Sequence, residues 1–279
     1  MNDSMTVALI HEVFHGAEGP ERLARRLEEA RRGGAELALL PELPLQPWIP
    51  ATREHREEDA EEPGGPIHRL LAEAARDGSI GVMGGAIVRE PASGRRFNRA
   101  LLFDAQGRLV ERYDKLHIPC EEGFWERDHY EPGDEPPRRV DAFGMPFGLQ
   151  ICSDLQRPQG VWLLGAAGAA AVFGPRATPP GSYERWRRVI RADALLAAAY
   201  VISVNRPAPE GGVEIGGPSL AVGPDGEPLV ESTDPVAWVT LERARVEAAR
   251  ADYPGYLDVR ASLYARAWSD LAGGGDEPR

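Results

Sequence analysis

The chain has 279 residues, 42% of them hydrophobic, so it is long enough to bury one large core and is expected to fold as a single domain. Its 32 basic and 44 acidic residues give a net charge of −12 without any basic cluster, which argues against nucleic acid as a partner. The two cysteines, Cys120 and Cys152, are too few for a disulfide framework or a multi-cysteine metal site, so each thiol needs its own explanation.

Membrane insertion is also not expected. No apolar run approaches the roughly 20 residues that a membrane-spanning helix needs, and the N-terminus carries no basic region followed by an apolar signal-like segment. We therefore expect a cytoplasmic protein without a membrane partner.

Short apolar runs alternate with helix-length amphipathic segments along the whole chain. In chain order, the first half predicts a strand at 5–10, a helix at 21–32, a strand at 37–40, a helix at 66–76 and strands at 80–88, 98–104 and 109–113. The second half predicts a strand at 147–152, a helix at 160–167, a strand at 170–173, a helix at 183–199 and strands at 200–204, 219–222, 228–231 and 238–241. This alternation is typical of an α/β fold.

Turns and charged segments complete the expected organisation. Gln106-Gly107 and Asp225-Gly226 each lie between two predicted strands and indicate hairpins, so the sheets should be mixed rather than purely parallel. Residues 57–62 are acidic and predict an exposed loop. Residues 273–279 are rich in glycine and charge, which predicts a flexible tail after a domain of residues 1–272.

Three polar residues of complementary types follow predicted strands. Glu42, Lys115 and Cys152 each stand where a strand end presents a side chain to a cleft. A thiol with a pKa near ~8.5 is mostly protonated at neutral pH, so a nucleophilic cysteine needs a base, and Glu42 is suited to that role. Lys115 and the backbone N–H of Ser153 are suited to stabilise the oxyanion that forms when a carbonyl is attacked.

Each of these residues also has an ordinary explanation. Buried cysteines are common in cores, and strand-end Glu or Lys residues are usually solvated, so the combination carries the argument. A Cys-His scheme with His117 or His129 as the base is the chemical alternative. Cys120 is interpreted as a small loop or core residue and is left out of the catalytic set.

Three segments resemble the signature blocks of the nitrilase, or carbon-nitrogen hydrolase, superfamily. They are PE at 41–42, YDKLHIP at 113–119 and ICSD at 151–154, in the order and at the separations of that family. The resemblance extends from Val7 to about Tyr264. It implies a four-layer αββα sandwich with mixed sheets, which pairs into an eight-layer homodimer or a higher homo-oligomer, and catalysis without a metal or organic cofactor.

The segment after Lys115 is similar to the amidase and N-carbamoyl-hydrolase branches of the family. WER at 125–127 and YEPGD at 130–134 match that pattern, which implies that Glu126 is a second catalytic glutamate that positions the substrate or the lysine. Cys152 is followed by Ser-Asp instead of the Trp-Glu pair of true nitrilases, which disfavours nitrile hydrolysis. Arg157, shortly after the nucleophile, is a candidate anchor for an anionic substrate group, with Arg176 as the alternative anchor.

The sequence therefore predicts a cysteine-dependent hydrolase of non-peptide amide or N-carbamoyl bonds in a small molecule, acting through a thioester-like acyl-enzyme. One alternative is a family member that forms amides or exchanges acyl groups by using an amine in place of water. A second alternative is a catalytically silent scaffold that binds a metabolite.

Overall fold

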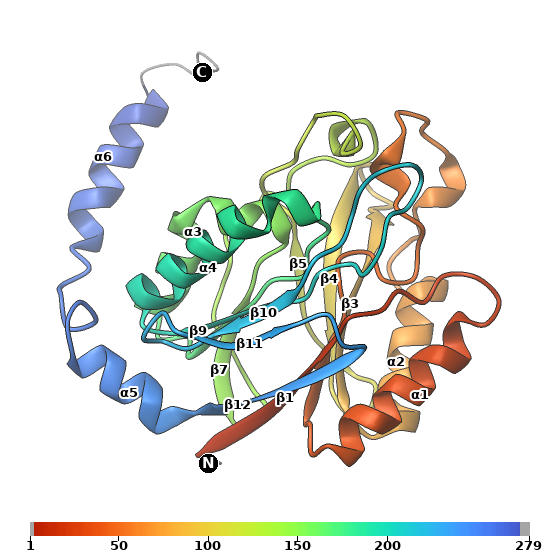
Figure 1. The fold of residues 1–279 in the computed structure, drawn as a ribbon. Helices are drawn as coiled ribbons and strands as arrows, with labels where there is room; N and C mark the ends of the chain where they lie inside the picture. Colours follow the sequence, from red (N-terminus) through yellow and green to blue (C-terminus); the bar gives the residue numbers. More distant parts are fainter. Residues whose placement is uncertain (1–2, 274–279) are drawn as a thin grey trace.

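Two mixed six-stranded sheets pack face to face at the centre of the protein, in a computed structural model that describes residues 3–273 (Figure 1). The first sheet has the order β12-β1-β2-β3-β4-β5, formed by β1 (Ser4–Ile10), β2 (Leu37–Leu39), β3 (Gly81–Arg89), β4 (Arg96–Phe103), β5 (Leu109–Asp114) and β12 (Val236–Glu242). The second has the order β11-β10-β9-β8-β7-β6, formed by β6 (Val140–Ala142), β7 (Met145–Leu149), β8 (Ala171–Phe173), β9 (Tyr200–Ser203), β10 (Ser219–Val222) and β11 (Pro228–Ser232).

Each sheet combines a parallel centre with antiparallel edges. In the first sheet β2 pairs in parallel with β1 and β3, and in the second β8 pairs in parallel with β7 and β9. The predicted hairpins are β4-β5 and β10-β11, which pair antiparallel. The expectation of mixed sheets is therefore confirmed.

Helices cover the outer faces of both sheets. Helices α1 (Gly19–Arg32) and α2 (Pro66–Gly78) lie on the first sheet, and α3 (Pro158–Ala166) and α4 (Tyr183–Ala197) lie on the second (Figure 1). The apolar side chains on α1 recur with helical spacing at Leu23, Leu27 and Ala30, and all three are fully buried. The four layers confirm the predicted αββα sandwich.

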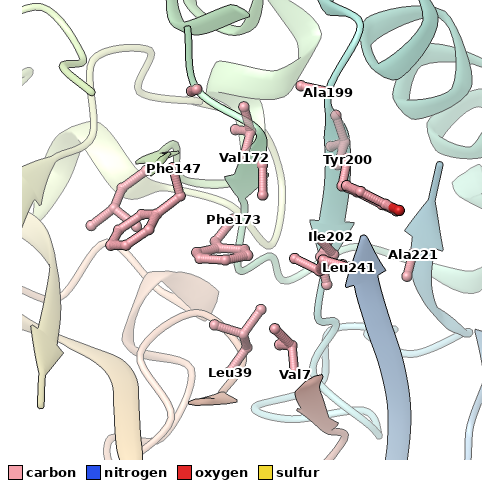
Figure 2. Close-up of a cluster of buried hydrophobic side chains, with 14 of the residues drawn as sticks. Val7, Leu39, Phe147, Val172, Phe173, Ala199, Tyr200, Ile202, Ala221 and Leu241 are labelled. Atoms are coloured by element: carbon pink, nitrogen blue, oxygen red, sulfur yellow. The ribbon is translucent and has the colours of Figure 1, made fainter. Parts of the chain in front are cut away.

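Apolar side chains fill the space between the two sheets (Figure 2). Val7, Leu39 and Leu241 of the first sheet and Phe173 and Ile202 of the second belong to one buried cluster. Full burial of each large side chain in such a cluster contributes about 1.5–3 kcal/mol to stability. This core fixes the position of one sheet relative to the other.

The strand predicted at 147–152 ends earlier than expected. Strand β7 stops at Leu149, and Cys152 begins a short 3-10 helix, Cys152–Gln156. The backbone φ of Cys152 is 47°, in the left-handed region that a strand cannot contain. Within residues 3–273, four further 3-10 turns lie at Ile49–Ala51, Glu57–Asp59, Glu126–Asp128 and Pro180–Ser182.

Two helices after β12 were not predicted from the sequence. Helix α5 (Arg243–Ala251) buries Val246, and α6 (Ala261–Gly273) buries none of its residues. Figure 1 shows most of α6 extending away from the sandwich, while Tyr264 near its start packs edge-on against Trp162 of α3, with 5.6 Å between the ring centroids. The apolar side chains Tyr264, Trp268 and Leu271 of α6 recur with helical spacing, although all three are exposed, and the sequence prediction missed this helix. Of the predicted tail, Gly273 ends α6, and residues 274–279 lie outside the described part of the chain.

Within residues 3–273, no helix combines the length and apolarity that crossing a bilayer requires.

Candidate active site

The structure brings three of the predicted catalytic residues into direct contact. Lys115 Nζ donates a hydrogen bond to Glu42 Oε1 at 2.8 Å and another to Glu126 Oε2. The three side chains are 0–1% exposed, so their charges interact through a dry interior. An ammonium has three N–H donors, and two of them are occupied here, which leaves the third for another acceptor.

Both glutamates keep one oxygen atom without a partner. Glu42 Oε2 and Glu126 Oε1 are buried and find no hydrogen-bond donor among residues 3–273. A buried acceptor without a donor costs about 1–3 kcal/mol, so such atoms point to a ligand or a catalytic role. Each glutamate therefore has one oxygen bound to the lysine and one oxygen available to a reacting group.

Cys152 lies within electrostatic range of this cluster and has a strained backbone conformation. It is 5% exposed, its N–H donates to the Pro175 carbonyl at 2.9 Å, and its Sγ lies 3.8 Å from the Ala177 carbonyl oxygen. The left-handed conformation of a non-glycine residue costs roughly 1–2 kcal/mol, and strain of this kind is concentrated at functional sites. The backbone N–H of Ser153, in the first turn of the 3-10 helix, has no acceptor within residues 3–273.

The electrostatics keep the resting thiol protonated. Burial raises the pKa of Cys152 well above its usual value, the carboxylate of Glu42 raises it further, and Lys115 opposes both effects. Burial alone lowers the pKa of Lys115, but the charges of Glu126 and Glu42 outweigh burial and hold that pKa above its usual value. Burial raises the pKa of Glu126 to about 7, although Lys115 stabilises its charged form. A base is therefore required before the thiol can attack.

An open cleft of about 820 Å³ reaches Ser153, next to the nucleophile, but Cys152 itself does not line it. It is lined by Leu116, His117, Ile118, Pro119, Arg127, Tyr130, Glu131, Pro132, Ser153, Gln156 and Arg157. Arg157 is exposed on this cleft, as an anchor for a substrate group would be. The anchoring role of Arg157 stays a prediction.

Arg176 lies in the interior and is absent from the cleft lining. Its Nε donates to Ser203 Oγ at 3.1 Å, its Nη1 to Thr178 Oγ1 at 2.6 Å and its Nη2 to the Pro218 carbonyl oxygen. It is fully buried, and burial lowers its pKa to about 10. Because all three nitrogen atoms already have protein partners, the geometry favours Arg157 over Arg176 as the anchor.

The two histidines of the alternative scheme have other partners. His117 Nδ1 lies 2.8 Å from Asp154 Oδ1, and His129 Nε2 lies 2.6 Å from the Thr52 carbonyl oxygen. Neither histidine is a hydrogen-bond partner of Cys152, whose Sγ contacts a backbone carbonyl. This arrangement favours a glutamate as the base.

Asp154 ends the ICSD segment, and the sequence alone assigned it no role. Its carboxylate is fully buried and accepts hydrogen bonds from the N–H groups of Ile151, Leu116 and His117, from the His117 ring and from the Tyr113 hydroxyl. One carboxylate thereby joins the turn of the nucleophile to the segment that follows the lysine. The position of Asp154 at the end of the ICSD segment, which resembles a family signature, was the available signal for it.

Arg206 is a second residue whose role sequence reasoning missed. Its Nη1 donates to the backbone carbonyls of Glu42 and Leu43 at 2.8 Å each, and its Nη2 donates to the Gln46 carbonyl at 3.1 Å. Glu210 balances its charge at 2.6 Å. Arg206 therefore fastens the loop that carries Glu42.

Comparison with known proteins identifies relatives that span most of the chain. The carbon-nitrogen hydrolase family model matches residues 13–251. The chain is 28% identical over 276 residues to 2-oxoglutaramate amidase from Paenarthrobacter nicotinovorans, covering 94% of this chain and 91% of that protein. It is 27% identical over 220 residues to N-carbamoylputrescine amidase from Solanum lycopersicum, covering 72% of this chain and 73% of that protein.

A solved structure supports the same relationship. A mutant amidase from Nesterenkonia sp. AN1, which shows Michael addition of acrylamide at its active site cysteine, is 25% identical and aligns with a TM-score of 0.74 over 95% of this chain and 99% of that chain. The family model itself matches far more than half of the chain. The chain therefore belongs to the carbon-nitrogen hydrolase family, as its motifs predicted.

Proposed function

We propose that the protein hydrolyses amide or N-carbamoyl bonds of a small molecule through a covalent acyl-enzyme on Cys152. The observation that carries this proposal is the contact of Lys115 with two buried glutamates, each of which keeps one oxygen free, beside a buried thiol. A base, a cation and a nucleophile in a water-poor site are the groups that acyl transfer needs.

The first half of the reaction forms the acyl-enzyme. Glu42 Oε2 accepts the thiol proton of Cys152 while the sulfur attacks the carbonyl carbon of the substrate. The third N–H of Lys115 and the backbone N–H of Ser153 donate to the resulting oxyanion, a contribution of several kcal/mol in comparable sites. The tetrahedral intermediate collapses, the carbon-nitrogen bond breaks, and Glu42 passes its proton to the departing nitrogen, which leaves as ammonia or an amine.

The second half of the reaction releases the acid. Glu42 takes a proton from water, the oxygen attacks the thioester carbon, and the carbon-sulfur bond breaks. The sulfur leaves as a thiolate, and the proton held by Glu42 returns to it. Glu126 Oε1 is the remaining acceptor and is suited to bind the N–H of the substrate.

The relatives support both substrate classes. One is named for 2-oxoglutaramate, which carries a primary amide, and another for N-carbamoylputrescine, which carries a carbamoyl group. Both groups present a carbonyl bound to NH2. The acrylamide adduct of the Nesterenkonia amidase supports the assignment of a cysteine as nucleophile.

A substrate panel with an acyl-trapping step tests the proposal. Purified protein is incubated with ω-amides of dicarboxylic acids, N-carbamoyl amines, N-carbamoyl amino acids and simple aliphatic amides, and ammonia release is measured. Hydroxylamine is then added to the best substrate, because an acyl-enzyme transfers its acyl group to hydroxylamine and gives a hydroxamate. Ammonia without hydroxamate would reject the covalent route, and neither product from any substrate would favour a silent scaffold.

A further inference from the structure

Asn98, on β4, contacts both Glu42 and the residues that surround Glu126 in the active site. Its Nδ2 donates to Glu42 Oε1 at 2.8 Å and to the Tyr130 hydroxyl at 3.2 Å, and its backbone carbonyl accepts the N–H of Lys115 at 3.0 Å. The Tyr130 hydroxyl donates in turn to Glu126 Oε2. With the two bonds from Lys115 Nζ, these side chains close a ring, which we call the carboxylate ring: Glu42, Lys115, Glu126, Tyr130 and Asn98.

The donors of the carboxylate ring converge on one oxygen of each glutamate. Glu42 Oε1 accepts from Asn98 and Lys115, and Glu126 Oε2 accepts from Lys115 and Tyr130. The terminal torsion of a glutamate is soft, so a single donor leaves the carboxylate free to turn. Two donors from different directions restrict that rotation and select the oxygen that stays unpaired.

We propose that Asn98 and Tyr130 are positioning residues that hold Glu42 Oε2 and Glu126 Oε1 toward the reacting groups and keep Glu126 ionised. This inference rests on the proposed function. The carboxylate ring contains two carboxylates and one ammonium, so it holds an excess negative charge in a buried site. Tyr130 and Asn98 are buried, with exposed fractions of 3% and 2%. The hydroxyl of Tyr130 and the side-chain amide of Asn98 are neutral donors that stabilise that charge.

The direction of the pH effect follows from these contacts. Burial raises the pKa of Glu126 to about 7, and the hydrogen bond from Tyr130 lowers it. Removal of that donor therefore raises the pKa of Glu126 further. Because an ionised Glu126 is the competent form, activity is lost as the pH falls through this pKa, and a higher pKa moves the loss to higher pH.

Tyr130→Phe tests the inference, since it removes one oxygen atom and keeps the aromatic ring in place. We expect kcat/KM to fall about tenfold and the acid limb of its pH profile to move upward by about one pH unit, the effect of one buried hydrogen bond to a charged group. Tyr200→Phe is the matched control, because Tyr200 is a fully buried tyrosine on β9 whose hydroxyl contacts the backbone of Glu242. Its pH profile should match that of the parent.

Asn98→Leu provides a second variant in case Tyr130→Phe does not fold. It removes both N–H donors at similar size, and we expect a larger fall in kcat than the phenylalanine variant shows, with the acid limb moved in the same direction. An unchanged pH profile in every folded ring variant would overturn the inference. Failure of the proposed function has a different signature, because the parent protein itself would then release no ammonia.

Discussion

Arg206 donates a hydrogen bond to the backbone carbonyl of Glu42 at 2.8 Å, across 164 positions of sequence. The same nitrogen reaches the next carbonyl, and Leu43 has a φ of 48°, so the loop of the candidate base holds an unfavourable conformation. The planar guanidinium is suited to this task because its donors reach several acceptors at once.

Arg206→Lys should loosen that loop while it preserves the charge. A lysine ammonium cannot reach all the acceptors, so we expect a loss of about 1–3 kcal/mol in the free energy of unfolding and a fall of roughly tenfold in kcat/KM. Urea denaturation and steady-state kinetics measure the two effects. Arg191→Lys, at a partly exposed arginine on α4, is the control and should leave both unchanged.

The two cysteines of the chain provide a paired test of the nucleophile. Cys152 is buried in the site and Cys120 is exposed. Cys152→Ala should reduce kcat by at least ~10³-fold with little effect on folding, and Cys120→Ala should change it less than about twofold. Ammonia release that survives in the Cys152 variant within about tenfold of the parent would contradict the mechanism.

Glu42→Gln should separate thiol ionisation from catalysis. The charge of Glu42 raises the pKa of Cys152, so its removal should lower that pKa and make thiolate form at lower pH. Hydrolysis should nevertheless fall by about 10²-fold or more, because the base is lost. Thiolate absorbance in the ultraviolet, followed against pH, measures the first effect in the Cys120→Ala background. A pKa of Cys152 that stays unchanged or rises in the Glu42 variant would contradict this effect of the Glu42 charge.

Arg157→Gln tests the anchor on the cleft. If a substrate carboxylate binds the guanidinium, the substitution should reduce kcat/KM for acidic substrates by about 1.5–3 kcal/mol and leave matched neutral amides nearly unchanged. The neutral substrates serve as the internal control. Equal losses for the two classes would assign Arg157 a structural role.

The outer layer of α3 and α4 is the surface on which the expected homo-oligomer can be tested. Leu163, Leu195 and Leu196 are 46%, 38% and 56% exposed on these helices. If two copies pack there, Leu196→Arg should shift the protein toward monomer, because an interface cannot bury an unpaired charge cheaply. Analytical ultracentrifugation measures the shift, with Leu109→Arg, at an exposed leucine on β5, as the control.

The sequence predicted most of the helices and strands and proposed the central trio, but it missed β6, α5 and α6. An apolar run precedes each of Glu42, Lys115 and Cys152 and indicated a strand. The motifs that contain these residues resemble those of a family with a known fold. Residues that act on one another across the fold were harder to recognise. Tyr130 and Asn98 are 32 positions apart, and their contact depends on side-chain orientations that no spacing rule contains.

Local backbone geometry set a second limit on prediction. The apolar pattern extended the strand to residue 152, because hydrophobic runs continue through buried turns as readily as through buried strands. The φ of Cys152 shows that the chain leaves the strand there. Helix α6 was also missed, although its exposed apolar side chains Tyr264, Trp268 and Leu271 recur at helical spacing.

The candidate base and nucleophile are attached to different sheets, Glu42 after β2 and Cys152 after β7. Side chains such as Leu39 and Phe173, which never meet substrate, therefore act as spacers that set the distance over which a proton must travel. A change of one methylene in that interior is transmitted through close packing as a shift of one sheet against the other. Mutations in the core of this protein can thus alter its turnover while they leave every residue of the cleft intact.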